Sequence, residues 1–193
     1  MDLEELHRRL PEIKNISDDT IRHEVEKIFL TWCPDYFWEK PASSSGNHHQ
    51  VDHRGKHGLW IHTRRAAVAF ERLSKSYLHQ NLINEQMRDC GRAAILVHDI
   101  FKYGKPEAGN SHTTKDHDKM AATFLRNKSK LPPTAIGCIE SHNGAWYKGK
   151  SPETPIEQVH HLADMIASDE SAYFKVEDPH RKIEEMMVDI EEP

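Results

Sequence analysis

Apolar residues recur along this chain mainly at intervals of three and four, the spacing that gathers them on one face of an α-helix. Residues 1 to 31 hold two such stretches, and Ser17 is a candidate N-cap for the second, Asp18 to Trp32. Few segments alternate at the two-residue period of a strand. The pattern therefore predicts an all-α fold. Five further helices are expected: Trp60 to Tyr77, Asn84 to Phe101, Asp116 to Arg126, Pro133 to His142 and Ile156 to Ala172.

The segment from Cys33 to His57 shows neither period. It holds two prolines, three consecutive serines and two glycines, so we expect a long loop of the kind that often carries function. Its histidines either belong to a polar loop or place protons and phosphate contacts beside a site. They are His48, His49, His53 and His57.

A length of 193 residues fits one domain of ordinary size. We expect an N-terminal part, residues 1–56, whose helices and histidine-rich loop pack on a core. The core itself spans residues 57–175, and residues 176–193 form an acidic tail. Cys33, Cys90 and Cys138 are predicted to be plain thiols, because they are odd in number and include no Cys-x-x-Cys pair.

The net charge, the apolar runs and the first residues indicate which partners and which cellular location to expect. The 26 basic and 31 acidic residues give a formal net charge of -5, which provides no general attraction to nucleic acid. The longest fully apolar run, Ala93 to Val97, is far shorter than the roughly 20 residues of a transmembrane helix. The first residues lack the basic start and apolar stretch of a secretory signal. We expect a cytoplasmic protein that does not act at a membrane.

Histidine is the residue type out of proportion, at 15 of 193 residues, and it is the commonest metal ligand in proteins. His62 lies four residues before Ala66, on the face that its helix turns toward the core. His98 and Asp99 directly follow the apolar run at 93–97, where an unpaired aspartate would be costly to bury. Polar side chains therefore point inward at two places.

Three more polar residues share this placement. His117 precedes Ala121 by four residues, His142 follows Ile139 by three, and Asp164 lies on the apolar face of the last predicted helix. Any one of these residues could be a hydrogen-bonded core histidine or a capping aspartate. Six of them from five helical segments favour a metal cluster, because coordination neutralises buried carboxylates and gives each imidazole a partner.

In this order the residues resemble the HD-domain superfamily of metal-dependent phosphohydrolases, whose ligands run His, His-Asp, two further histidines in the two-metal members, and Asp. The run from Val97 to Lys102 is similar to the family's His-Asp-Ile-Gly-Lys, with Phe101 in place of glycine. The resemblance spans residues 57–172 and implies an HD-domain helical bundle with a five-helix metal-binding core. The matching positions are His62, His98, Asp99, His117, His142 and Asp164.

The resemblance also implies two divalent metal ions bridged by Asp99. A mixed nitrogen and oxygen ligand set suits manganese, iron, cobalt, nickel, zinc or magnesium. The expected catalytic residues are Asp99 and Lys102, with Lys102 stabilising charge on the phosphoryl group. The expected division of the remaining ligands is His62, His98 and Asp164 on one ion, and His117 and His142 on the other.

The activity that follows is hydrolysis of a phosphate ester of a nucleotide or related small phosphate, of phosphodiesterase or nucleotidase type, by metal-activated water. Three alternatives stay open: a nuclease on single-stranded nucleic acid, a mixed-valent diiron oxygenase on the same scaffold, and a silent nucleotide-sensing module. A homo-oligomer is left open as well. Candidate substrate contacts are Lys102, Arg64 with its neighbour Arg65, Lys105, His112, Lys115 and Trp146.

Overall fold

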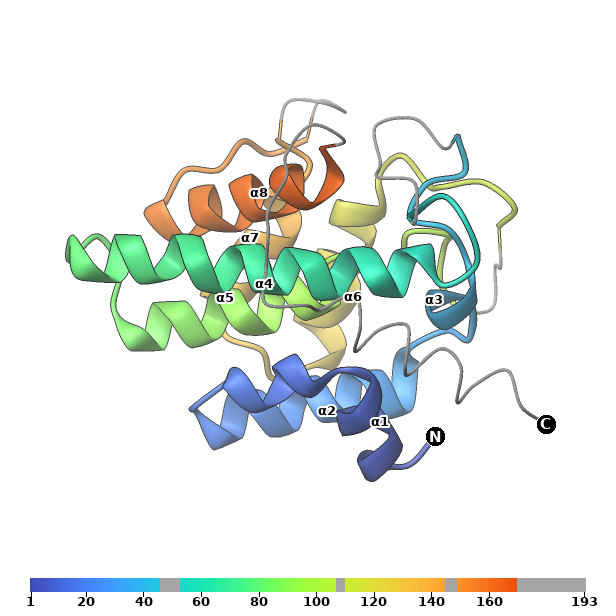
Figure 1. Ribbon diagram of the computed structural model, residues 1–193, viewed down its shortest axis with the longest axis horizontal. Coiled ribbons are helices and arrows are strands. Elements are labelled where there is room, and N and C mark those ends of the chain that lie inside the picture. The colour runs from blue at the N-terminus through green and yellow to red at the C-terminus, as the bar shows by residue number, and fades with distance from the viewer. Residues whose placement is uncertain (46–52, 107–109, 145–148, 170–193) are drawn as a thin grey trace.

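The computed structural model describes residues 1–45, 53–106, 110–144 and 149–169 (Figure 1). Within these ranges the chain forms α-helices and one 3₁₀ helix, with no strand, so the all-α prediction is confirmed. None of these helices combines the length and the apolar character needed to cross a bilayer. The elements are α1 Leu3–Arg9, η1 Pro11–Asn15, α2 Asp19–Trp32, α3 Tyr36–Glu39, α4 Gly58–His79, α5 Glu85–Val97, α6 His117–Lys128, α7 Pro133–Ser141 and α8 Pro155–Ser168.

Helix α2 begins at Asp19, one residue later than predicted, and its N-cap is Asp18. The side chain of Asp18 accepts hydrogen bonds from the backbone N–H groups of Thr20 and Ile21, two donors that have no partner inside the helix. The prediction of Ser17 as N-cap was therefore wrong. A serine and an aspartate stand side by side here, and both are good caps, so the local sequence could not choose between them.

Helix α5 ends at Val97, four residues before the predicted Phe101. The residues that follow form turns, and the N–H of Ile100 donates to the carbonyl of Val97 over 3.2 Å, a tighter bond than that of an α-helix. His98 and Asp99 therefore stand at the end of α5 and not along its side.

The predicted loop from Cys33 to His57 contains a helical turn, α3, which the sequence reading missed. Phe37 and Trp38 of this turn are buried, and their rings pack edge-to-face with centroids 4.9 Å apart. Three consecutive aromatic residues are too short a run to show a helical period. This part of the segment belongs to the core.

The histidines of the same segment are not residues of a solvent-facing loop where the structure describes them. His53 has 0% of its surface exposed and His57 has 3%. His57 adopts a left-handed backbone (φ 66°), and its ring nitrogen Nδ1 lies 2.5 Å from the carbonyl of Trp38. His48 and His49 lie outside the described residues.

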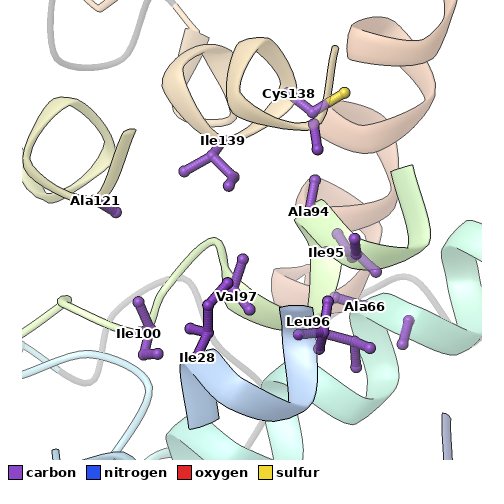
Figure 2. Packing of buried hydrophobic residues seen from close by; sticks show 14 of the residues in the cluster. Ile28, Ala66, Ala94, Ile95, Leu96, Val97, Ile100, Ala121, Cys138 and Ile139 are labelled. Atoms are coloured by element: carbon purple, nitrogen blue, oxygen red, sulfur yellow. The ribbon is translucent and has the colours of Figure 1, made fainter. Parts of the chain in front are cut away.

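Helices α4 and α5 connect the two sides of the bundle, since α4 packs on α8 and α5 packs on α2. In Figure 1 α4 runs between α8 and α5, with α1 and α2 beneath α5 in this view. Figure 2 shows Ile28 of α2 beside Val97 of α5, while Ile139 of α7 faces the same interior. The N-terminal helices therefore share one hydrophobic core with the rest of the bundle. The domain boundaries at residues 56 and 175 stay predictions, and the tail lies outside the described residues.

A buried aspartate attaches the start of α2 to α5. Asp89 of α5 accepts hydrogen bonds from the backbone N–H groups of Ser17, at 3.1 Å, and Asp18, at 2.8 Å. Its Oδ1 also accepts a hydrogen bond from Nη1 of Arg92 over 2.8 Å. The Nε of Arg92 in turn donates to Oε1 of Glu71 over 2.6 Å. These bonds hold the N-terminal helices on the helix that ends at the His98–Asp99 pair.

Replacing Asp89 with alanine should lower the free energy of unfolding by about 2–3 kcal/mol, because the partly buried backbone N–H groups of Ser17 and Asp18 lose a charged acceptor. Urea denaturation followed by circular dichroism measures this loss. Glu85→Ala is the matched control: Glu85 is on the same helix with its side chain 61% exposed, and its pair with Arg88 should contribute less than about 0.5 kcal/mol. Equal losses in the two variants would contradict the attachment.

Candidate metal centre

The six predicted ligands come together inside the bundle. All six are buried. Three of them, all histidines, stand at helix ends, and this position fixes the orientation of their rings, as described below. The residues are His62 in α4, His98 as the C-cap of α5, Asp99 after it, His117 as the first residue of α6, His142 as the C-cap of α7, and Asp164 in α8.

The side-by-side packing of α4 and α8 produces the first group of donor atoms (Figure 1). His62 Nε2 lies 2.9 Å from Oδ1 of Asp164. His98 Nε2 lies 3.5 Å from the same oxygen. One nitrogen from α4, one from the end of α5 and one oxygen from α8 therefore face a common point.

The carboxylate of Asp99 joins this group to a second one. Its Oδ2 lies 3.4 Å from His98 Nε2 and 3.7 Å from His62 Nε2. Its Oδ1 lies on the other side, 3.0 Å from His117 Nε2 and 3.5 Å from His142 Nε2. The two oxygens of one aspartate therefore face two different pairs of imidazoles.

Three of the imidazoles have their orientation fixed by a carbonyl three residues earlier. His98 Nδ1 bonds to the carbonyl of Ile95 at 2.8 Å, and His142 Nδ1 bonds to that of Ile139 at 2.7 Å. These carbonyls belong to the last turns of α5 and α7, where the helix offers no partner. His117 Nδ1 makes the same kind of bond to Thr114 at 2.7 Å. Because a carbonyl can only accept, each Nδ1 carries a proton.

It follows that the Nε2 atoms of these rings present lone pairs when the rings are neutral. His117 Nε2 and His142 Nε2 are only 3.1 Å apart, with Asp99 Oδ1 beside both. His98 Nε2 and Asp99 Oδ1 are buried without a hydrogen-bond partner. Electron pairs packed this closely repel one another unless positive charge lies among them, so the donor set fits a divalent cation.

Among the residues that the structure describes, two overlapping sets meet the spacing that a metal ion requires, since their ligand atoms lie within 4.8 Å of one another. His98 is common to both sets, which departs from the expected division that gives it to one ion alone. The sets are His62, His98 and Asp164, and His98, Asp99 and His142.

The charges of these six side chains follow from burial and from their contacts. Burial alone would raise the pKa of Asp99, but Lys102 and His98 hold it well below the usual range of an aspartate. Asp164 is also held low, by His62 and His98, against the effect of its burial. Burial favours the neutral form of His98, but the carboxylates of Asp99 and Asp164 raise its pKa to about 10. A proton on His98 thus supplies part of the positive charge when metal is absent.

Lys102 contacts the centre directly. Lys102 follows Asp99 by three residues, and its Nζ lies 2.5 Å from Oδ2 of Asp99. Its side chain is 13% exposed. The ammonium group therefore stands at the edge of the cluster, between the buried carboxylate and the outside.

The two neighbouring arginines of α4 go to different places. Arg64 is buried and bonds to Glu12 of η1 through Nη2 at 2.8 Å and Nε at 2.9 Å. Two residues along a helix turn the side chain about 200° away from His62. The structure therefore gives Arg64 a role in packing η1 on α4, and the expectation of a phosphate contact there is corrected. Arg65 lies on the side of His62, and its Nη1 bonds to His53 Nε2 at 2.9 Å.

Three of the remaining expected substrate contacts lie in one connection between helices. Lys105, His112 and Lys115 are exposed in the segment between the end of α5 and the start of α6. Lys105 Nζ lies 5.8 Å from the ring centre of Phe124. Trp146 lies outside the described residues. Substrate binding by these four residues stays a prediction.

One buried histidine near the cluster was missed by the sequence reading. His160 of α8 has 0% of its surface exposed, and its ring centre lies 5.7 Å from that of His98 and 6.3 Å from that of His142. It precedes Asp164 by four residues, so the helical spacing that placed Asp164 inward applies to His160 as well. Burial lowers the pKa of His160 well below that of a free histidine, so the ring is neutral.

Comparison with known protein families agrees with this geometry. A family model described as HD domain matches residues 59–169, more than half of the chain. The chain therefore belongs to the HD domain family, a superfamily of metal-dependent hydrolases. No curated protein and no solved structure matches it. The matched range contains all six clustered residues and leaves out α1, η1, α2 and α3.

Replacing Asp99 with alanine should reduce bound metal more than about tenfold, because the carboxylate that faces both pairs of imidazoles is gone. Elemental analysis after loading with manganese or iron and dialysis gives the metal content. Asp116→Ala, which removes a side chain that is 68% exposed just before α6, should keep the wild-type content. Equal metal in Asp99→Ala and wild type would remove Asp99 from the centre.

Metal binding should release protons and weaken in acid. His98 carries a proton below a pKa of about 10, and a cation must displace that proton to reach Nε2. Below this pKa the apparent affinity should fall about tenfold per pH unit for each proton displaced. Calorimetric titration with Mn²⁺ at pH 7.5, in buffers of different ionisation enthalpy, counts the protons. No net release would contradict this description of His98.

Proposed function

We propose that this chain is a phosphohydrolase that cleaves a phosphate ester of a nucleotide or a related small phosphate. The observation that carries the proposal is the Asp99 carboxylate, whose two oxygens face two pairs of buried imidazole nitrogens. Family membership supports a metal-dependent hydrolase, and the nucleotide class of substrate goes beyond it.

The donor set would hold two divalent cations, with Asp99 between them. Two such ions supply Lewis acidity toward a phosphoryl oxygen and a bound water acidic enough to act as nucleophile near neutral pH. The oxygens and imidazoles suit manganese, iron, cobalt, nickel, zinc or magnesium. The ligands would be His62, His98 and Asp164 on one side, and His117 and His142 on the other.

Lys102 has two roles in this proposal. Its ammonium group bonds to Oδ2 of Asp99 and so keeps that carboxylate ionised and turned toward the imidazoles. Its partial exposure also leaves it within reach of a phosphoryl oxygen, where a positive charge would stabilise the charge that develops during hydrolysis.

The substrate we propose is small because the chain carries a net charge of -5, which opposes a long polyanion. Local positive charge comes from the loop between α5 and α6, and Lys105, His112 and Lys115 are the proposed contacts there. Trp146 is proposed to stack on a base. Arg64 is left out of the substrate contacts because Glu12 holds it on the other side of α4.

The experiment is a substrate screen on full-length protein, prepared without oxygen and loaded with Mn²⁺ or Fe²⁺. The panel holds generic phosphomonoesters and diesters, nucleotides, and a single-stranded oligonucleotide. Release of phosphate or nucleoside from small esters under nitrogen, lost in Asp99→Ala, supports the proposal. Cleavage confined to the oligonucleotide would point to a nuclease, and turnover that requires oxygen uptake would point to a diiron oxygenase.

Replacing Lys102 with methionine should lower kcat by about 100-fold or more at a Mn²⁺ concentration that keeps the centre occupied, because the transition state loses a charge that the ligands do not supply. Steady-state kinetics with metal analysis of the same sample measures both. Lys119→Met, a lysine of α6 with its side chain 49% exposed, is the control and should keep the wild-type rate. A wild-type kcat in Lys102→Met would exclude the lysine from the reaction.

A further inference from the structure

His62 differs from the other three imidazoles of the centre in its place on its helix. His98, His117 and His142 stand at helix ends, where a carbonyl three residues earlier receives Nδ1. His62 lies inside α4, and the corresponding carbonyl, that of Leu59, accepts the hydroxyl of Thr63 at 3.0 Å. His62 thus stands along the side of α4, where residues from outside the helix can pack against its ring.

One residue from outside the helix lies against the ring of His62. His53 packs edge-on to His62, with ring centres 5.4 Å apart and planes at 83°. His53 is itself held by Arg65, whose Nη1 lies 2.9 Å from His53 Nε2. Arg65 follows His62 by three residues on α4, so both side chains project from the same face of the helix.

The bond from Arg65 also fixes the protonation of His53. A guanidinium group can only donate, so His53 Nε2 is the acceptor and carries no proton. The ring is therefore neutral, with its hydrogen on Nδ1. A neutral ring can pack closely against His62 without adding charge that would oppose a cation beside it.

The backbone around His53 is fixed as firmly as its ring. Its carbonyl accepts the N–H of Ala42 at 2.9 Å. The same carbonyl lies so close to Gly58 that an added Cβ there would stand 2.1 Å from the oxygen, and no side chain other than hydrogen fits. The turn that precedes α4 thus fixes the position of His53 beside His62.

We propose that Arg65 and His53 are positioning residues that hold the ring of His62 with Nε2 aimed at Asp164. The inference rests on the proposed metal-dependent function, since it assigns the pair a task at the metal centre. It also means that the centre depends on residue 53, which lies before the family-matched range of 59–169. The N-terminal part then contributes to the site as well as to the core.

The test compares the two neighbouring arginines of α4. Arg65→Gln should weaken the affinity for Co²⁺ about 10- to 100-fold and change the visible spectrum of the Co²⁺-loaded protein, as loss of a group that orients a metal ligand does. Arg64→Gln breaks the buried pair with Glu12, so it should lower the urea midpoint and leave Co²⁺ affinity and spectrum unchanged. Circular dichroism confirms that each variant is folded.

His53→Ala is the second variant, and it keeps the proposal testable if Arg65→Gln does not fold. It should weaken Co²⁺ binding to a similar extent, and the double variant should lose little more than either single one, because both residues act through His62. Wild-type affinity and spectrum in folded Arg65→Gln or His53→Ala would overturn the proposal. So would an equal loss in Arg64→Gln, because a general loss of packing would then explain the effect.

These titrations need no turnover, so they separate the inference from the proposed function. A wild-type protein that binds Co²⁺ and hydrolyses no phosphate ester contradicts the function and leaves the positioning role to be decided by the variants. A wild-type protein that binds no Co²⁺ contradicts both.

Discussion

Lone pairs of imidazoles and carboxylates that face one another inside a helical bundle are the constraint on which this structure depends. Asp99 Oδ1 and the Nε2 atoms of His117 and His142 stand 3.0 to 3.5 Å apart in a place where water cannot screen them. Such an arrangement raises the free energy of the metal-free protein and is relieved by a cation. Metal binding and folding are therefore linked, and a bound ion stabilises the native state by mass action.

Helix ends are what make this arrangement precise enough for coordination. A helix leaves its last carbonyls without partners, and a histidine at the C-cap can bond to one of them through Nδ1, which turns Nε2 away from the helix. The ends of α5 and α7 both use this device. The hydrophobic core holds the helices that carry these ends, and Asp89 adds the N-terminal helices to it. Packing far from the centre thus sets the positions of its ligand atoms.

The sequence predicts the helices and the inward direction of the six polar residues because both follow from one spacing, three to four residues per turn. It could not predict that α5 stops at Val97, since the apolar pattern continues through Ile100 and Phe101. Nor could it separate Arg64 from Arg65, because the partner that decides between them, Glu12 or His53, is far away in sequence. The burial of His53 and the helical turn α3 could not be predicted for a related reason: both depend on the tertiary fold and not on a local period.

The most direct measurement is the anomalous diffraction of crystals grown with Mn²⁺. The account predicts two manganese peaks, one on each side of the Asp99 carboxylate, with His62 and Asp164 beside one peak and His117 and His142 beside the other. Manganese absent from this place, with the six side chains joined only through water and hydrogen bonds, would contradict it.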